Sequence, residues 1–474
     1  MNEHRRTKIV ATIGPATRSV ETMSELIGAG VDVFRFNFSH GTREEHSENV
    51  AMAREASLAA DKQVGILGDL PGPKIRLADV HGGVIDLETG TELTLTTEPV
   101  VGTPQRIGVS WDGLPAAVSP GGEIYMADGR IRLRVAAVED GEVRSVVEVG
   151  GPVASHQGLN LPGADVQLPA AGREDLNWVD FAIEQEIDLL AVSFVRRAED
   201  ITPVERRCRT SGADIPVIAK IEKPQAAEQA EEIVKAVTAG VMIARGDLGI
   251  ELPIEQVPVV QKRLLALTGQ YSRPSITATQ MLLSMVESPR PTRAEVSDVA
   301  NAIYQGTDAV MLSEETAVGE YPVEAVRVMD RIARETEPDL PYGDWVFNRA
   351  SADPSDVANS VARAAVGSTY TLGLAALVVP TRSGRTARLV SAHRPRVPVL
   401  AVSPRPETVR RLNLLFGVRC AIAEDWTSLR ALLDDCARLA RETGIAASGD
   451  LIGITAGLPQ QELGTNLFEV HRVP

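Results

Sequence analysis

Pro216-Val-Ile-Ala-Lys-Ile-Glu222 has the pattern of a short buried strand that ends in two charged side chains. Its β-branched residues are typical of a parallel strand covered on both faces. Because side chains alternate along a strand, Lys220 and Glu222 should point to the same face of the sheet. A charge in an apolar element is costly unless it is paired or binds an ion. The stretch therefore indicates either a structural ion pair or a site for a metal and a phosphate, and the other strand ends must decide.

Seven further runs share this apolar, β-branched character, and helical patterns such as Ala226–Thr238 and Thr292–Tyr304 separate most of them. The runs are Lys8–Ile13, Asp32–Phe38, Gln63–Leu70, Leu189–Phe194, Val241–Ala244, Ser275–Gln280 and Ala309–Leu312. Together with residues 216–222 they form eight βα units, which predict a (β/α)₈ barrel.

A different texture interrupts the barrel pattern between its third and fourth strands. Residues 72–161 contain short alternating strands and Gly- and Pro-rich turns, which predict an inserted all-β domain. Segments 1–71 and 162–345 then remain for the barrel, about 255 residues against the ~250 of a typical barrel. A domain inserted at the active-site end is placed to act as a lid.

A break rich in proline and aspartate at Glu337–Asp356 separates the barrel from a third region, residues 346–474. The βαβ order resumes there, which predicts a carboxyl-terminal α/β domain with a mostly parallel, helix-covered sheet. The whole chain is therefore expected to be of the α/β class.

Bulk properties exclude several classes of function. The net charge of −16 argues against nucleic-acid or anionic-membrane binding, and no run of 18 apolar residues is present to span a bilayer. The three cysteines, Cys208, Cys420 and Cys436, lack the spacing of a zinc site. The first ten residues lack an apolar signal segment, so we expect a cytoplasmic protein.

Barrel enzymes work at the carboxyl ends of their strands, and six of the eight expected strands end in polar residues. Arg35, Asn37 and Ser39 share one parity and therefore one face. The other polar ends are Asp69, Lys220 with Glu222, Asp247 between glycines, Thr277-Ala-Thr-Gln280 and Ser313-Glu-Glu-Thr316. Packing alone does not readily produce so many polar ends, which favours a site.

The residue types indicate phosphoryl transfer. Two carboxylates, Glu222 and Asp247, suffice for a Mg²⁺ that takes its other ligands from substrate and water. The nearby cations Lys220, Arg35 and Arg76 suit a reaction that needs positioning and charge neutralisation. Thr279 offers a hydroxyl able to relay a proton. Individually, Thr279 could instead cap a helix and Asp247 could instead hold a turn.

At these residues the chain resembles the pyruvate kinase family, in order and over nearly its whole length. The similar motifs are Thr7–Pro15, Arg35–Gly41, Gly72–Arg76, Gly158–Gly163, Ala219–Glu222, Ala244–Gly249, Ala278–Met281 and Pro289–Asn301. The resemblance implies that phosphoenolpyruvate and ADP become pyruvate and ATP in glycolysis, through a transient enolate. It implies Mg²⁺, for which Mn²⁺ can substitute, an allosteric carboxyl-terminal domain and a homotetramer.

The resemblance also implies a role for each matching residue. Arg35 holds the transferred phosphoryl group and Lys220 stabilises it in transit, while Glu222 and Asp247 bind the metal. The backbone of Gly246 and the side chain of Thr279 bind the substrate carboxylate. Thr279 also takes part in the proton relay. The nucleotide contacts are assigned to Asn37, His40 and Arg76, and the monovalent-cation position to Asn37, Ser39 and Asp69.

Five departures from the family pattern stand out. Leu70 replaces a hydroxyl ligand of potassium and Lys74 replaces an acid, so the Lys74 ammonium can supply the charge that potassium would bring. We therefore predict activity without potassium, as in the bacterial branch of the family that carries this lysine; the alternative is a solvated charge at the lid hinge. Gln157 replaces a lysine near the nucleotide phosphates, and Leu283 and Glu314 replace a family Glu and Gly.

In the third domain, Thr381-Arg-Ser-Gly-Arg-Thr386 follows an expected strand and opens a helix. Small hydroxyls, a glycine and two arginines at a helix start favour an anion, although an ordinary capped turn has the same composition. Family resemblance makes Thr381, Arg382, Ser383, Gly384, Arg385 and Thr386 a sugar-phosphate effector loop. The late loop Thr455–Pro459 lacks a basic residue, which favours a monophosphate such as ribose 5-phosphate or AMP over a bisphosphate.

Two other interpretations remain. A different barrel enzyme that forms pyruvate enolate, such as an aldolase or a phosphoenolpyruvate mutase, would lack the lid, the nucleotide-side residues and the third domain. A degenerate paralogue retained for effector binding would have lost Lys220, Glu222, Asp247 or Thr279, and all four are present.

Overall fold

Eight short parallel strands close into a barrel at the centre of the computed structural model, which describes residues 5–127, 129–164, 168–348, 352–353, 355–426, 428–457 and 464–474. In chain order the strands are β1 (Lys8–Thr12), β2 (Val33–Asn37), β3 (Gly65–Asp69), β13 (Leu189–Val195), β14 (Val217–Ile221), β15 (Gly240–Ala244), β16 (Ser275–Ala278) and β17 (Ala309–Leu312). Each pairs in parallel with its neighbours, and β17 returns to β1. The barrel prediction is confirmed.

Helices cover the outside of the barrel because their apolar stripes pack on the strands' outward faces. The larger ones are α1 (Val20–Ala29), α2 (Arg43–Ala59), α4 (Arg173–Glu184), α5 (Thr202–Thr210), α9 (Val257–Gln270), α10 (Arg293–Tyr304) and α12 (Pro322–Thr336). A separate apolar cluster, including Val10, Leu67 and Met242, fills the barrel interior. Every residue of β14 is buried, which accounts for its almost unbroken apolar run.

One local expectation was wrong. The helix expected at 226–238 is two short helices, α6 (Pro224–Glu228) and α7 (Ala230–Ala236), because the backbone leaves the helical region at Gln229. The residues around Asp247 form helix α8 (Arg245–Glu251), so Gly246 and Asp247 lie in its first turn.

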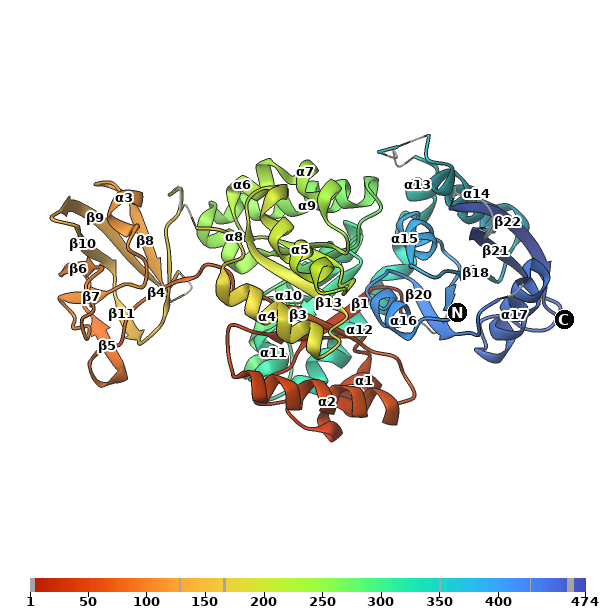
Figure 1. Cartoon of the computed structure of the whole chain (residues 1–474), viewed down its shortest axis with the longest axis horizontal. Helices are drawn as coiled ribbons and strands as arrows, with labels where there is room; N and C mark the ends of the chain where they lie inside the picture. Colours follow the sequence, from red (N-terminus) through yellow and green to blue (C-terminus); the bar gives the residue numbers. More distant parts are fainter. Residues whose placement is uncertain are drawn as a thin grey trace.

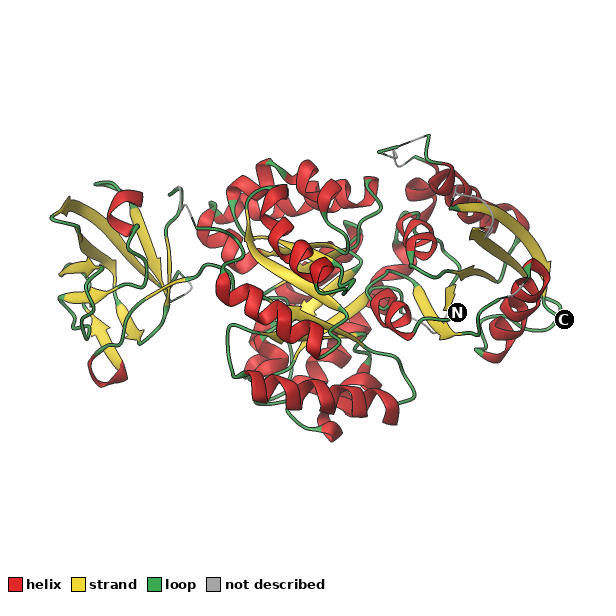
Figure 2. Cartoon of the chain, viewed as in Figure 1, coloured by secondary structure: helices red, strands yellow, loops and turns green. Residues whose placement is uncertain are grey.

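A β-rich body lies between β3 and α4, beside the carboxyl ends of the barrel strands (Figures 1 and 2). Its seven-stranded sheet has the order β4 (Ile75–Arg76), β12 (Gly158–Asn160), β8 (Glu123–Met126), β9 (Ile131–Glu139), β10 (Glu142–Val149), β6 (Glu92–Thr96) and β7 (Arg106–Gly108). Strands β5 (Val84–Leu87) and β11 (Gly151–Ala154) pair separately, and α3 covers Leu114–Ala117. This β body has its own apolar core, distinct from that of the barrel.

The carboxyl-terminal domain is a five-stranded sheet with the order β20 (Val418–Ile422), β19 (Val399–Ser403), β18 (Ala376–Pro380), β21 (Leu451–Gly457) and β22 (Thr465–Arg472). Only the β21–β22 pair in this sheet is antiparallel. Its helices are α14 (Val357–Leu372), α15 (Arg385–Ala392), α16 (Pro406–Leu412) and α17 (Leu429–Glu442), after a linking α13 (Tyr342–Phe347). The predicted mostly parallel sheet is confirmed.

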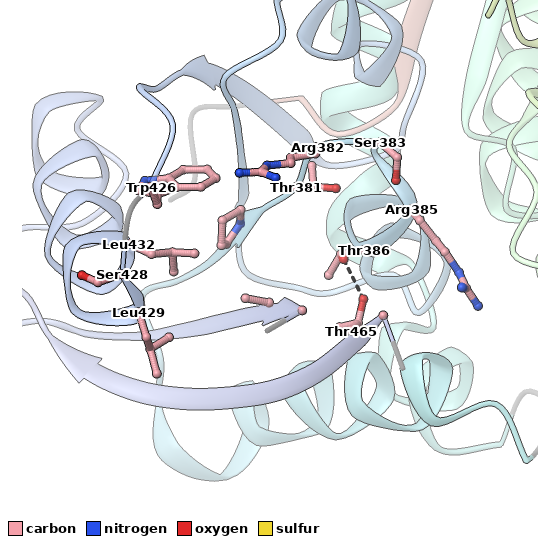
Figure 3. A pocket seen from close by; sticks show the side chains of 14 residues that line it. Thr381, Arg382, Ser383, Arg385, Thr386, Trp426, Ser428, Leu429, Leu432 and Thr465 are labelled. Atoms are coloured by element: carbon pink, nitrogen blue, oxygen red, sulfur yellow. Dashed lines mark hydrogen bonds between the residues drawn. The ribbon is translucent and has the colours of Figure 1, made fainter. Parts of the chain in front are cut away.

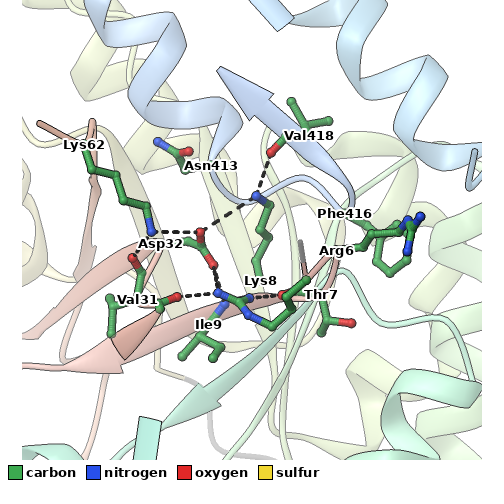
Figure 4. A network of polar contacts seen from close by, with 12 residues as sticks. Arg6, Thr7, Lys8, Ile9, Val31, Asp32, Lys62, Asn413, Phe416 and Val418 are labelled. Carbon is green, nitrogen blue, oxygen red and sulfur yellow. Dashed lines mark hydrogen bonds and ion pairs between the residues drawn. The ribbon is translucent and has the colours of Figure 1, made fainter. Parts of the chain in front are cut away.

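This domain packs against the amino ends of the barrel strands through charged side chains (Figure 1). Arg394 pairs with Asp308 at 2.7 Å, and Arg410 pairs with Asp188 at 2.7 Å. Lys8 Nζ donates to the Val418 carbonyl at 2.7 Å, beside the buried Asp32 carboxylate (Figure 4). Of the helices in the described ranges, none is both long and apolar enough to span a bilayer.

Candidate active site

Lys220 lies at the centre of a charged cluster at the carboxyl ends of the barrel strands. Its Nζ is 2.9 Å from Glu222 Oε1 and 3.2 Å from Asp69 Oδ1, and it donates to Ser193 Oγ at 2.8 Å. The side chain is 9% exposed, whereas Glu222 and Asp69 are 1% and 0% exposed. Strand parity thus correctly brought Lys220 and Glu222 together.

Asp69 joins two strand ends that are far apart in the sequence. Its Oδ2 is 2.6 Å from Arg35 Nη2, and Arg35 Nη1 donates to Thr12 Oγ1 at 3.0 Å. Burial alone would raise the pKa of Asp69, but Lys220 and Arg35 together hold it below its ordinary value. Asp69 therefore stays ionised at neutral pH and pairs with both cations, which it holds around one carboxylate.

Lys220, on β14, and Glu222, just after this strand, have shifted pKa values. Burial would lower the pKa of Lys220, but Asp69 and Glu222 raise it above the ordinary lysine value, so the ammonium stays charged. Burial, together with repulsion from Asp247, raises the pKa of Glu222 despite the attraction of Lys220. A positive ion between Glu222 and Asp247 would relieve that repulsion.

The carboxylates suit a divalent metal that shares its coordination with substrate. Glu222 Oε2 accepts from the Phe194 amide at 2.6 Å, which fixes its orientation. Asp247 lies in the first turn of α8, and its side chain makes no hydrogen bond or ion pair with the described residues. Within the same residues no group of three His, Cys, Asp or Glu side chains is placed to hold a metal. The oxygen donors Glu222 and Asp247 fit Mg²⁺, which usually keeps several non-protein ligands.

Thr279 and Gly246 come together at the ends of β16 and β15. The Gly246 amide donates to Thr279 Oγ1 at 2.8 Å, and that hydroxyl donates to the Ala278 carbonyl at 2.6 Å. Thr279 has φ +67°, a left-handed conformation that is costly for a β-branched residue. Such strain persists only where neighbours enforce it, and it aims the hydroxyl toward the helix start.

Arg245 supplies that enforcement, although sequence reasoning gave it no role. Its Nη2 donates to the Thr279 carbonyl at 2.9 Å, and its Nη1 is 2.7 Å from Asp298 on α10. Ser193, which links Lys220 to the Leu70 carbonyl, was also missed. Both follow the rule used for the other residues, since each lies at a strand's carboxyl end.

The residues predicted to face the nucleotide are more dispersed. Asn37 Oδ1 accepts from the Ser39 amide at 3.2 Å, and the exposed His40 contacts His46 through its carbonyl at 2.8 Å. Arg76 lies on β4 of the β body and donates to the His156 carbonyl at 3.1 Å. Among the described residues it makes no ion pair with the Lys220 cluster.

Lys74 lies in the chain that leads into the β body. A Cβ at Gly158 would come within 2.3 Å of its Cε, so the side chain rests against β12. The ion pairs of Asp69 within the described residues are with Arg35 and Lys220. Lys74 thus lies in the segment that enters the β body, and among the described residues no ion pair joins it to Asp69.

The remaining departures from the family pattern are Gln157, Leu283 and Glu314. Gln157 Oε1 accepts from the Ala154 amide at 3.0 Å, within the β body. Leu283 begins a 3₁₀ turn, Leu283–Val286, and Glu314 is exposed at the start of α11 (Glu314–Ala317). Nothing in the structure explains the last two substitutions.

The loop Thr381–Thr386 borders a cavity of about 380 Å³ in the carboxyl-terminal domain (Figure 3). Gly384 has φ +82°, and its amide donates to Thr381 Oγ1 at 3.0 Å, which makes the tight turn into α15. Arg382 pairs with Asp425 at 2.8 Å, and Thr386 bonds Thr465 at 2.6 Å. Of the late loop 455–459, residues 458 and 459 lie outside the described ranges.

A (β/α)₈ barrel with a buried lysine, an arginine and two carboxylates at its strand ends belongs to the enzymes that act on phosphorylated substrates with a metal. The profile "Pyruvate kinase, barrel domain" matches residues 4–326, and "Pyruvate kinase, alpha/beta domain" matches residues 359–471. The chain belongs to the pyruvate kinase family.

Curated relatives support this assignment over the whole chain. The pyruvate kinase of Geobacillus stearothermophilus is 43% identical over 471 residues, which cover 98% of this chain and 80% of that protein. That of Bacillus licheniformis is 42% identical over 472 residues, with 99% and 80% coverage. A crystal structure of a pyruvate kinase from Cryptosporidium parvum superposes with a TM-score of 0.93 at 34% identity, covering 99% of this chain and 96% of that chain. The chain is thus a phosphotransferase whose substrates are phosphoenolpyruvate, ADP or ATP, and pyruvate, and which depends on a divalent metal.

Proposed function

We propose that Lys220 and Arg35 hold the phosphoryl group as it moves from phosphoenolpyruvate to ADP, with Mg²⁺ as the divalent metal. The observation that carries this proposal is the position of the Lys220 ammonium, buried and shared between Asp69 and Glu222. The test is ADP-dependent pyruvate release, followed with a lactate dehydrogenase couple, with and without Mg²⁺. Pyruvate formation at the same rate without ADP, or in excess chelator, would refute it.

The other residues position the substrate. Glu222 and Asp247 would hold Mg²⁺, which supplies positive charge beside the phosphoryl oxygens when bound. The Gly246 amide and the Thr279 hydroxyl lie at one helix start and are suited to donate hydrogen bonds to the substrate carboxylate. Thr279 Oγ1 already takes part in two hydrogen bonds, and this supports a role in passing a proton to the enolate carbon.

Residues 72–161 act in this proposal as a lid that closes over the barrel, residues 1–71 and 162–345. Gly72 has φ +69°, and its amide donates to Asp175 Oδ1 at 2.8 Å. This hydrogen bond anchors the start of residues 72–161 on α4. Closure would carry Arg76 towards a nucleotide bound near Asn37 and His40. Single-molecule or scattering distances between the β body and the barrel should shorten when ADP and phosphoenolpyruvate analogues are both present.

We also propose that the enzyme turns over without potassium because Lys74 supplies a charge at the hinge. Asn37, Ser39 and Asp69 would form the monovalent-cation position, and the Lys74 ammonium would repel an ion there. Wild-type turnover should be the same in sodium-free Tris buffer with and without potassium. Lys74→Glu, which restores the family acid, should make turnover rise with potassium. A potassium requirement in the wild type would overturn the proposal.

The loop Thr381–Thr386 is proposed to bind the phosphate of an allosteric effector. Its hydroxyls, the Gly384 turn and Arg382 beside a 380 Å³ cavity support a monophosphate such as ribose 5-phosphate or AMP. Phosphoenolpyruvate saturation curves recorded with each compound should shift to lower substrate concentration. The absence of a shift with any of them would refute the effector site.

We propose a homotetramer in the cytoplasm, as in the family pattern. Light scattering of the purified chain should give about four times the mass of 50.7 kDa. A monomer or dimer at working concentration would contradict this.

A further inference from the structure

A second cleft lies behind the Thr381–Thr386 loop, between the carboxyl-terminal domain and the barrel. Its volume is about 260 Å³, and Ser383 and Arg385 border both this cleft and the effector cavity. Thr238, Ala239 and Pro274 form its opposite wall, at the amino ends of barrel strands. In Figure 3, Arg382 points towards Trp426, whereas Arg385 points away from it. The loop therefore presents one arginine to each side.

Arginines from both domains meet beside this cleft, in an adjoining cavity of about 190 Å³. Arg388, on the first turns of α15, donates through Nη1 to the Thr238 carbonyl at 3.2 Å. Its Nε is buried and has no hydrogen-bond partner among the described residues. Arg273, from the barrel, lines this cavity together with Arg385 and Arg388. Since a guanidinium has five N–H donors in a fixed fork, Arg388 keeps donors for a ligand.

Carboxylates balance only part of this charge, although Asp353 and Asp356 line the 190 Å³ cavity together with the three arginines. Within the described residues, neither Arg388 nor Arg273 has a carboxylate oxygen within 4 Å. Asp356 is 3.2 Å from Arg385, and the exposed Asp214 is 3.7 Å from Arg411. Burial and the guanidinium groups of Arg273 and Arg385 lower the pKa of Arg388 to about 10. In a chain of net charge −16, a half-buried group of like charges is costly unless an anion binds there.

We propose that the 190 Å³ cavity beside the interdomain cleft is a second anion site, which binds a phosphoryl dianion between Arg388 and Arg273, with Arg385 at its edge. The dianion is that of inorganic phosphate or of a small phosphate ester, since both present the same oxygens to a planar fork. Because Arg388 belongs to the carboxyl-terminal domain and Arg273 to the barrel, the ligand cross-links the two domains. Arg385 then connects this site to the effector loop, which it also borders.

Hydrogen–deuterium exchange of the full chain with inorganic phosphate tests the site, with sodium chloride at equal ionic strength as reference. Phosphate should protect peptides that cover residues 234–239 and 385–390 in the wild type. In Arg388→Gln this protection should need at least about tenfold more phosphate, the loss expected for a charge-assisted hydrogen-bond pair. Arg382→Gln, which alters only the Trp426 side of the loop, should keep the protection of residues 234–239.

Further variants separate the outcomes. Arg273→Gln removes the barrel's cation, and should weaken phosphate protection like Arg388→Gln even if one of the two folds poorly. Ribose 5-phosphate that protects residues 234–239 at lower concentration than phosphate identifies an ester as the ligand; equal concentrations identify the free ion. The proposal is overturned if phosphate does not protect residues 234–239 in the wild type. It is also overturned if that protection is unchanged in both Arg388→Gln and Arg273→Gln. Loss of protection only in Arg382→Gln assigns the phosphate to the effector loop and also overturns it.

Discussion

The barrel carries a buried charge cluster at each end, and the two clusters differ in how completely their charges are neutralised. At the amino end, the Asp32 carboxylate is 2.9 Å from Arg5, 3.4 Å from Lys62 and 3.8 Å from Lys8, and it also accepts from the Ile9 amide at 3.0 Å (Figure 4). At the carboxyl end, Glu222 has one cation, Lys220, which it shares with Asp69.

The pKa values express this difference. Burial would raise the pKa of Asp32, but Arg5, Lys8 and Lys62 lower it far below its ordinary value. Burial and Asp247 instead raise the pKa of Glu222. The amino-terminal cluster is complete without a ligand, which suits a joint between the barrel and the carboxyl-terminal domain. The carboxyl-terminal cluster carries negative charge in excess around Glu222 and Asp247, as expected of a site that a metal completes.

Replacement of Lys220 should have the largest effect. Lys220→Met removes the charge proposed to meet the phosphoryl group and should lower kcat by at least about 10³-fold, or about 4 kcal/mol. Lys62→Met removes a cation from the amino-terminal cluster and should leave kcat within about twofold, since it lies at the other end of the barrel. The coupled pyruvate assay compares the two, and circular dichroism checks the fold. Retained turnover in Lys220→Met would refute its assigned role.

Asp32→Asn should break the amino-terminal cluster. It removes the anion of Lys8 and one of the two anions of Arg5, which also pairs with Asp330 at 2.9 Å, and this should cost about 3 kcal/mol of stability at pH 7. Because the folded-state pKa of Asp32 lies below its ordinary 3.8, its contribution is complete above pH 3.8. That contribution is lost as the pH falls below 3.8 towards the folded-state value, so wild type and variant should converge in acid.

Urea unfolding at pH 7 and below pH 3.8 measures the Asp32 effect. Asp434→Asn is the control, because this carboxylate is 67% exposed and only 3.9 Å from its arginine. A constant difference between Asp32→Asn and wild type across that pH range would show that the cluster does not depend on the charge of Asp32.

Glu222→Gln should separate activity from stability. A neutral amide relieves the repulsion from Asp247, while Asp69 still pairs with Lys220, so the melting temperature should stay equal or rise. Turnover should fall about 100-fold, about 2.7 kcal/mol, and half-maximal activity should need more Mg²⁺. Glu337→Gln is the matched control, since burial also raises the pKa of Glu337 far from the site. A melting temperature that drops together with activity would make Glu222 a structural residue.

The sequence was sufficient for the barrel because each strand is a short apolar run whose polar end stands out. It also placed Lys220 against Glu222, since only the alternation within one strand is needed. It could not show that Asp69 bridges Arg35 and Lys220, because that contact depends on which strands are neighbours. The sequence also could not predict the strained backbone of Thr279. Its left-handed conformation depends on the contacts that Arg245 makes, whereas threonine by itself disfavours that conformation.

The sequence could not distinguish a charge cluster that is neutralised within the protein from one that still needs a metal ion. Lys8 and Asp32 are charges at strand starts, as Lys220 and Glu222 are at a strand end, and both pairs are buried. Their difference comes from Arg5 and Lys62, which reach Asp32 from outside the strands. Distances and burial were therefore needed to distinguish the structural cluster around Asp32 from the candidate active site around Lys220.

Asp298→Asn should have the smallest effect, because it acts on the site through another residue. Arg245 links Asp298 to the Thr279 carbonyl, so without the ion pair Thr279 should be held less firmly in its strained conformation. A partly exposed pair contributes up to about 1 kcal/mol, which predicts a rise of about fivefold in KM for phosphoenolpyruvate. The values of kcat and of KM for ADP should stay within about twofold.

Asp180→Asn is the matched control for Asp298→Asn. It breaks a similar pair, since Asp180 bonds Arg207 through both oxygens at 2.6 Å, but between α4 and α5 on the barrel exterior. If Asp298 only stabilises its helix, both variants should lower the melting temperature alike and leave KM unchanged. A change in KM for phosphoenolpyruvate in Asp298→Asn alone would show that the strained Thr279 is held by a chain of charges that begins at the protein surface.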